Sequence, residues 1–201
     1  MEKIIFATGN PGKLREIREI LQNYEIVSMK EAGVEGPIEE GGSTFRENAY
    51  CKAKAIWDIT GGLVMADDSG LEVDFLEGRP GVYSSRFMGE DTSYVVKNQE
   101  ILRLLEGAKG KERRARFRAC ICAITAEGDV LYTEGTMEGE IAQAPAGEGG
   151  FGYDPILFLP EYDKTSAQLK EEEKNAISHR GQALRRIKEM LEKKNENTNY
   201  K

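Results

Sequence analysis

The residues best suited to chemistry in this sequence are two adjacent carboxylates, Asp67 and Asp68, which follow the apolar run Leu63–Ala66. An apolar run entered through two glycines is typical of a buried strand, and successive strand side chains point to opposite faces. Only one of the two carboxylates can therefore face a given cleft. A carboxylate in that position could hold a hard cation such as Mg2+ or act as a general base. The alternative is a plain Asp-Ser-Gly turn that closes a hairpin.

A second candidate site is the turn Thr8-Gly-Asn-Pro-Gly-Lys13, between a predicted strand and a predicted helix over 13–22. Asn10 can cap this helix, and Pro11 suits its first turn. Free backbone N–H groups at a helix start, with a lysine beside them, have the geometry that binds phosphate. An ordinary strand-to-helix turn would have the same sequence. The turn is not a P-loop, because Leu14 stands where that motif needs Ser or Thr.

Three further segments carry polar side chains of interest. The glycine-rich loop 147–155 places Phe151 and Tyr153 beside the Asp154 carboxylate, so it could stack a base and bind its edge, or simply pack on the core. His179-Arg180 falls in the first turn of the last predicted helix, where the helix dipole disfavours cations and an anionic or acceptor-rich partner is therefore indicated.

The third segment is the acidic loop before a predicted helix over 44–60, which contains Glu39 and Glu40. On their own these are solvated loop carboxylates. They matter to the chemistry only if the fold brings them near Asp68.

The elements that must position these residues alternate between strand and helix over the first half of the chain. A helix over 93–106, a hairpin over 114–138 and a last helix with Leu184, Ile187 and Leu191 on its core face follow. This order predicts an α/β fold with a mixed sheet. We expect one domain over 1–194, with residues 195–201 as a frayed tail.

Composition narrows the classes of protein that remain. The chain has 201 residues, 39% of them hydrophobic, and a formal charge of −7, which disfavours binding to nucleic acid. The basic segment 109–118 alternates with apolar residues and is explained by one solvated strand face. Three cysteines and one histidine give no zinc set, and no signal peptide or membrane span is predicted. We therefore expect a reduced, soluble, cytoplasmic protein that binds no membrane.

Five segments together resemble one family. They are Thr8–Lys13, Ala66-Asp-Asp-Ser-Gly70, Pro80-Gly-Val-Tyr-Ser-Ser-Arg86, Gly149-Gly-Phe-Gly-Tyr-Asp-Pro155 and Ser178-His-Arg-Gly-Gln-Ala-Leu184. In this order they resemble the inosine triphosphate pyrophosphatase family, in its bacterial form, over nearly the whole chain. The resemblance implies two lobes around a long mixed β-sheet with flanking helices, a nucleotide cleft between the lobes, and a homodimer. It also implies Mg2+-dependent hydrolysis of the purine nucleoside triphosphates ITP, dITP and XTP to the monophosphate and pyrophosphate.

The resemblance also implies roles for individual residues. Asp68 would be the catalytic proton acceptor and a metal ligand. The second metal carboxylate would be Glu39 or Glu40, with Glu39 preferred because the pattern looks like Glu-x-x-Gly. Asp67 would be a supporting residue on the other face of the strand. The implied substrate contacts are Thr8, Gly9, Asn10, Pro11, Gly12, Lys13, Ser69, Phe151, Gly152, Tyr153, Asp154, Lys174, His179 and Arg180.

Three other functions stay open at this point. The chain could be a pyrophosphatase for modified pyrimidine nucleotides, a nucleotide sensor without catalysis, or an interaction domain in which the Asp pair is only a turn. A sensor that binds only anions gains nothing from Glu39, Glu40, Asp67 and Asp68, so the acidic set favours an enzyme.

Overall fold

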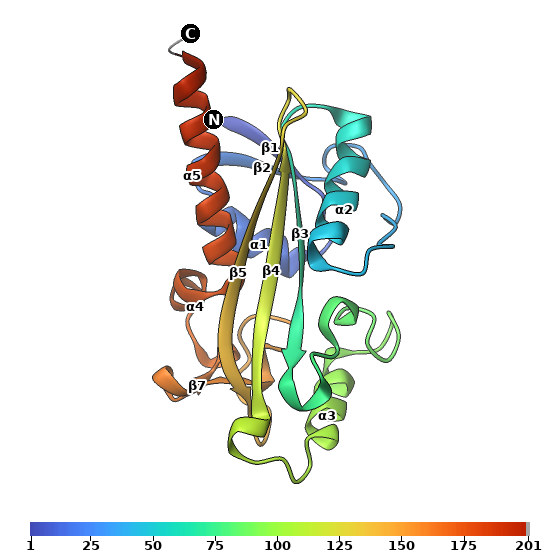
Figure 1. The fold of residues 1–201 in the computed structure, drawn as a ribbon, viewed down its shortest axis with the longest axis vertical. Coiled ribbons are helices and arrows are strands. Elements are labelled where there is room, and N and C mark those ends of the chain that lie inside the picture. The colour runs from blue at the N-terminus through green and yellow to red at the C-terminus, as the bar shows by residue number, and fades with distance from the viewer. Residues whose placement is uncertain (200–201) are drawn as a thin grey trace. The chain divides into compact units, whose positions relative to one another are not determined.

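The computed structural model describes residues 1–199 of the chain (Figure 1). Short 3-10 turns join the longer elements. In chain order, the helices and strands are β1 (Glu2–Phe6), α1 (Pro11–Ile20), β2 (Tyr24–Ser28), α2 (Phe45–Thr60), β3 (Val64–Val73), α3 (Tyr94–Leu104), β4 (Arg114–Ile124), β5 (Val130–Ile141), β6 (Leu157–Leu159), β7 (Lys164–Thr165), α4 (Glu171–Ile177) and α5 (His179–Asn199).

The strands of the described residues form one mixed sheet in the order β2-β1-β3-β4-β5-β6-β7. β1 pairs in parallel with β2 and with β3, whereas β6 is antiparallel to β5 and to β7. The α/β class and the mixed sheet predicted from the sequence are confirmed. The predicted location of a nucleotide between two lobes stays a prediction.

The chain divides into two compact units, each built from separate stretches of sequence. The first unit comprises Met1–Asp68, Ala119–Gly135 and His179–Lys201, and the second comprises Ser69–Arg118 and Thr136–Ser178. β3, β4 and β5 each contribute residues to both units.

The first unit has helices on both faces of its strands (Figure 1). Alternate residues of β1, Ile4 and Phe6, pack against Ile17 of α1 and Leu184 of α5 in one buried cluster. α2 buries its own apolar stripe on the opposite face and ends at Gly61, whose φ of 59° suits a residue without a Cβ. Helices α1 and α5 therefore lie on the same face of the sheet, and the turn after β1 leads to that face.

Strand β3 differs from the expected hairpin. It runs without a break from Val64 to Val73, so Asp67-Asp68-Ser69-Gly70 lies inside a strand and the turn interpretation is wrong. Leu71 and Val73 are fully buried, and their burial continues the strand beyond the polar residues. Asp67 and Asp68 lie just beyond the ladder with β1, which ends at the pair Phe6–Met65.

The second unit has a separate apolar core formed by β3, α3, β4, β5 and the segment around Tyr153. α3 begins after Ser93, whose hydroxyl accepts a hydrogen bond from the Val96 amide at 3.4 Å. Tyr153 and Tyr94 meet edge to face in this core, with ring centroids 5.2 Å apart. This packing holds the glycine-rich loop against the unit.

Helix α5 is longer than expected and runs to Asn199. The predicted tail 195–201 therefore begins within this helix, and its residues 200–201 lie outside the described residues.

Candidate active site

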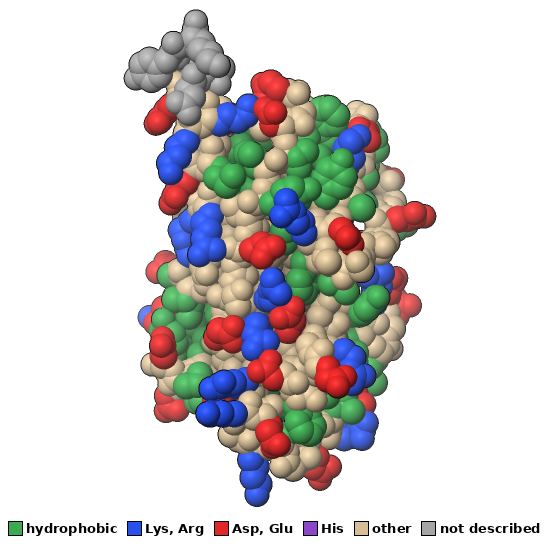
Figure 2. Space-filling model, viewed as in Figure 1, with side chains coloured by type: hydrophobic (Ala, Val, Ile, Leu, Met, Phe, Trp, Pro, Cys, Tyr) green, Lys and Arg blue, Asp and Glu red, His purple; other side chains and the backbone are tan. Residues whose placement is uncertain are grey.

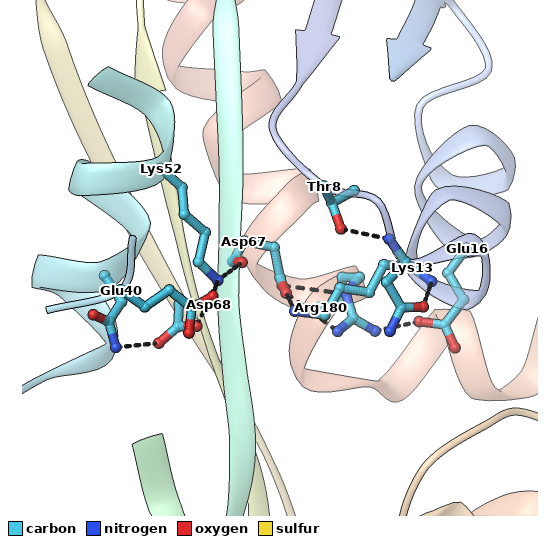
Figure 3. Close-up of polar contacts among 10 residues, drawn as sticks. Thr8, Lys13, Glu16, Glu40, Lys52, Asp67, Asp68 and Arg180 are labelled. Carbon is cyan, nitrogen blue, oxygen red and sulfur yellow. Dashed lines mark hydrogen bonds and ion pairs between the residues drawn. The ribbon is translucent and has the colours of Figure 1, made fainter. Parts of the chain in front are cut away.

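The turn after β1 has the predicted capped geometry. The Asn10 side chain accepts a hydrogen bond from the Lys13 amide at 3.1 Å, and the Thr8 hydroxyl accepts one from the Asn10 amide at 3.1 Å. Pro11 is the first residue of α1 and Asn10 is its cap, as the sequence predicted. The turn from Thr8 to Lys13 thus places the positive end of α1 beside β3 (Figure 3).

Asp67 joins this turn to the last helix through buried ion pairs (Figure 3). Its carboxylate lies 2.5 Å from Lys13 Nζ and 3.2 Å from Arg180 Nε. Arg180 Nη1 lies 2.5 Å from a carboxylate oxygen of Glu16 in α1. Two cations and two carboxylates therefore balance one another in the interior, which is the arrangement that buried charges require.

The charges of this network set the pKa values of its members. Burial alone would raise the pKa of Asp67, but Arg180 and Lys13 outweigh it and hold the pKa well below its usual range. Burial lowers the pKa of Lys13. Burial also opposes the charge on Arg180, but Asp67 and Glu16 raise its pKa. Asp67 is therefore a permanent anion that orients Lys13 and Arg180.

Asp68 points to the other side of β3 and has different partners (Figure 3). Its carboxylate accepts hydrogen bonds from Lys52 Nζ at 2.8 Å and from the Asn48 amide group at 3.2 Å. Burial raises the pKa of Asp68 despite the attraction of Lys52. A carboxylate with a raised pKa is better matched to general-base work near neutral pH than an ordinary aspartate.

The acidic loop is held beside Asp68 by α2. Lys52 Nζ lies 2.5 Å from Glu40 Oε1, and the Asn48 side chain accepts a hydrogen bond from the Gly42 amide at 2.9 Å. A Cβ at Gly42 would lie 2.7 Å from Oδ1 of the Asn48 side chain, so only glycine fits this close approach. Glu40 is half-buried and faces Lys52, whereas Glu39 is exposed. The geometry therefore favours Glu40 over the preferred candidate Glu39.

Three residues of the site were missed by the sequence analysis: Glu16, Asn48 and Lys52. Asn48 and Lys52 are four residues apart on α2 and are buried next to the apolar stripe of Ala49 and Ala53. The sequence did contain a signal for these residues, because polar side chains at helical spacing beside a buried apolar stripe need hydrogen-bond partners inside the fold. Glu16 stands in the same relation to Ile17 in α1.

The oxygen ligands around Asp68 could hold Mg2+ only together with ligands from a bound substrate. No group of three or more His, Cys, Asp and Glu side chains within residues 1–199 could hold a metal ion. Mg2+, however, is commonly bound through one or two carboxylates together with substrate phosphates. Asp68 and Glu40 would supply those two carboxylates, and phosphate oxygens would supply the rest.

The second unit brings together the predicted residues of the glycine-rich loop and α4. The Asp154 carboxylate accepts hydrogen bonds from the Phe151 amide at 2.8 Å, Lys174 Nζ at 2.6 Å and the Ser166 hydroxyl at 2.7 Å. Lys174 Nζ lies 5.1 Å from the centroid of the Phe151 ring. Asp154 is buried and occupied by these three donors, so it orders the loop around Phe151.

The sequence left open whether Tyr153 stacks on a base or packs on the core. In the structure it packs on the core and presents no ring face for stacking. It is 5% exposed, and its hydroxyl donates a hydrogen bond to the Ser84 carbonyl at 2.7 Å. Burial raises the pKa of this hydroxyl. Tyr153 packs against Tyr94 in the core although it lies in a glycine-rich turn segment. Of the two aromatic residues predicted to stack on a base, half-buried Phe151 is therefore the better candidate.

The remaining predicted residues lie where the elements place them. Ser69 follows Asp68 in β3, and the Gly152 carbonyl accepts a hydrogen bond from Asn98 at 3.1 Å. His179 is buried at the start of α5, where its carbonyl group passes so close to Gly135 that a Cβ there would clash.

Arg116 and Arg118 of the basic segment 109–118 pair with acidic side chains of their own unit, whereas buried Arg113 donates to backbone carbonyl oxygens. Arg116 lies 2.8 Å from Asp74 and 2.9 Å from Glu138, and Arg118 lies 3.3 Å from Glu72. On the face shown in Figure 2, Lys and Arg side chains are interleaved with Asp and Glu side chains. The strand therefore carries a mixed surface.

Within residues 1–199, none of the helices combines the length and the apolar character that a membrane span requires.

An α/β fold with a phosphate-type turn beside buried, cation-paired carboxylates is typical of an enzyme that acts on phosphate compounds. The chain belongs to the Ham1 family, whose sequence model matches residues 4–190. It is 48% identical over 197 residues to the dITP/XTP pyrophosphatase of Caldanaerobacter subterraneus subsp. tengcongensis, covering 96% of this chain and 98% of that one. The dITP/XTP pyrophosphatase of Bacillus subtilis is 47% identical over 195 residues, with coverage of 96% and 98%. Among solved structures, a HAM1 protein from Coxiella burnetii matches with a TM-score of 0.86 at 41% identity, covering 96% of this chain and 100% of that one.

Proposed function

We propose that this protein hydrolyses the non-standard purine nucleoside triphosphates ITP, dITP and XTP to the nucleoside monophosphate and pyrophosphate, and so removes them from the nucleotide pool. The observation that carries the proposal is the placement of the Thr8–Lys13 turn on one side of β3 at Asp67 and the Asp68–Glu40 pair on the other. The phosphate-binding turn thus contacts β3 at Asp67, the residue next to the proposed general base Asp68. The names of the similar proteins from two bacteria support the same substrate class.

The chemistry follows from the roles of these side chains. The Thr8–Lys13 turn binds the phosphates through its backbone N–H groups and the Lys13 ammonium. Asp68 accepts a proton from the water that attacks the α-phosphorus, and Lys13 meets the charge of the departing pyrophosphate. Asp68 and Glu40 would hold Mg2+, which would supply neutralisation of phosphate charge and polarisation of the phosphoryl oxygens. The preference for Glu40 rests on its contact with Lys52.

Base recognition is assigned to Phe151, Lys174, His179 and Arg180. Phe151 stacks on the purine, and His179 and Arg180 donate to its 6-keto oxygen. Adenine carries an amino donor at that position, so its binding would leave buried donors unpaired and is disfavoured. Arg180 forms ion pairs with Asp67 and Glu16, which restrict the position of its guanidinium group. Its predicted contact with the base therefore requires an N–H donor that these ion pairs do not use.

The proposal includes a homodimer in the cytoplasm. The homodimer rests on the family resemblance, and the cytoplasmic location rests on the reduced state expected for Cys51, Cys120 and Cys122, which are free thiols.

One assay tests the activity against its rivals. Purified protein is offered ITP, dITP, XTP, ATP, GTP and TTP with Mg2+, and pyrophosphate and orthophosphate are measured separately. We expect pyrophosphate from ITP, dITP and XTP and little product from ATP. Orthophosphate alone would contradict the proposed bond cleavage. A preference for the pyrimidine nucleotide TTP would indicate the pyrimidine enzyme, and binding without any product would indicate a sensor.

A further inference from the structure

The ammonium group of Lys52 lies between the two carboxylates proposed to hold the metal (Figure 3). Nζ is 2.5 Å from Glu40 Oε1 and 2.8 Å from Asp68 Oδ1, and it also donates to the Asp67 carbonyl oxygen at 3.2 Å. These three acceptors use all three of its N–H donors. The side chains are largely withdrawn from water, with exposures of 9% for Lys52 and 7% for Asp68.

This arrangement offsets one of the two carboxylate charges without a metal ion. Two carboxylates that approach each other in a partly dry site repel, and a cation between them removes the repulsion. The distances from Nζ to both carboxylates are those of charge-assisted hydrogen bonds from an ammonium group. A divalent cation on the same carboxylates would meet a positive charge at contact distance.

We propose that Lys52 is the resident counter-cation of the Asp68–Glu40 pair, and that a divalent cation must displace its ammonium to bind there. The inference rests on the proposed metal role of these carboxylates. Its consequence is that the free enzyme binds the metal weakly. The metal then enters together with the phosphates of the nucleotide, whose charge offsets the displaced lysine.

A purely structural role for Lys52 makes the opposite prediction. If Lys52 only tied α2 to β3, its removal would loosen Asp68 and Glu40 and weaken metal binding. If Lys52 competes with the metal, its removal strengthens metal binding in the absence of nucleotide. The sign of the change therefore separates the two roles.

The test measures Mn2+ binding to the purified protein without nucleotide, by the loss of the free Mn2+ signal in electron paramagnetic resonance. We expect Lys52→Met to bind Mn2+ about tenfold more tightly than wild type, or better, because a unit charge at contact distance is removed. Lys54→Met is the matched control, because Lys54 is on the same helix but pairs with exposed Asp58 at 2.5 Å. It should bind Mn2+ as wild type does. Unchanged or weaker binding by Lys52→Met overturns the proposal.

A second measurement uses the wild-type fold alone. In lysine-selective NMR, with the Lys52 signal assigned from Lys52→Arg, saturating Mg2+ without nucleotide should shift that signal as the ammonium leaves the carboxylates. A signal that stays in place overturns the proposal even if Lys52→Met fails to fold.

The outcomes also separate this inference from the proposed function. Pyrophosphate release from ITP by wild type, together with equal Mn2+ affinities for wild type and Lys52→Met, rejects the counter-cation and keeps the function. Tighter Mn2+ binding by Lys52→Met, with no turnover of any nucleotide by wild type, keeps the counter-cation and rejects the proposed function.

Discussion

Asp67 and Asp68 are consecutive residues of β3, but their carboxylates bind different cations on opposite sides of the strand. Asp67 lies 2.5 Å from Lys13, and Asp68 lies 2.8 Å from Lys52 (Figure 3). The alternation of a strand separates the two side chains, and the helices on either face supply one lysine each. Asp67 thereby contacts the turn after β1, whereas Asp68 contacts α2, and the roles proposed for the two carboxylates can be tested independently.

Replacement of Asp68 by asparagine should remove most of the activity and leave the fold intact. The amide keeps the shape of the carboxylate but cannot accept a proton, so we expect a loss in kcat of about a hundredfold to ten-thousandfold. Pyrophosphate release from ITP measures the loss, and circular dichroism checks the fold. Full activity in this variant would remove Asp68 from the mechanism.

Replacement of Asp67 by asparagine should instead act on stability. The variant leaves the buried Arg180 and Lys13 short of one negative charge, a change that typically costs about 3–5 kcal/mol. Urea unfolding measures the difference in free energy. Asp58→Asn is the control, because this exposed carboxylate also pairs with a lysine but should cost less than about 1 kcal/mol. Equal losses in the two variants would contradict the structural role of Asp67.

Glu39 and Glu40 can be separated by a matched pair of variants. We expect Glu40→Gln to raise the Mg2+ concentration needed for half-maximal turnover by about tenfold, because a hard cation loses a charged oxygen ligand. Glu39→Gln should leave it unchanged within about twofold, because this side chain is exposed, and surface substitutions away from a site have small effects. A Mg2+ titration of ITP turnover measures both values. The reverse order would restore Glu39 as the metal carboxylate.

The aromatic residues of the glycine-rich loop should behave differently from each other. Tyr153→Phe removes one buried hydrogen bond to the Ser84 carbonyl and should cost about 1 kcal/mol of stability, with little change in KM for ITP. Phe151→Ala should raise that KM about tenfold or more, because a stacked base contributes about 1–3 kcal/mol. Thermal unfolding and steady-state kinetics measure the two effects. A large rise in KM for Tyr153→Phe would place its hydroxyl at the substrate.

The three cysteines should differ in reactivity at pH 8. Burial raises the pKa of Cys120 to about 12 and that of Cys122 to about 12, so both stay protonated and unreactive. Cys51 is exposed. A disulfide reagent should therefore modify one thiol in the native protein and all three in denaturant, and Cys51→Ser should abolish the native reaction. Rapid modification of a second thiol in the native state would contradict the burial.

The sequence by itself determined the class of fold and most of the local structure. Periodicity located the main helices and strands, and the capping residue Asn10 marked where α1 begins, because these signals act within a few residues. Adjacent side chains in a strand must diverge, so the different directions of Asp67 and Asp68 could also be foreseen. The order of five short motifs predicted the family.

Only the tertiary structure decided which residues meet. Burial of Leu71 and Val73 carries β3 past Ser69-Gly70, against the local preference for a turn. Core packing, rather than composition, made Tyr153 a buried residue. The choice of Glu40 over Glu39 and the roles of Lys52 and Glu16 depend on contacts between elements far apart in sequence. Such contacts follow from how charges and volumes fit inside the fold, which no local pattern contains.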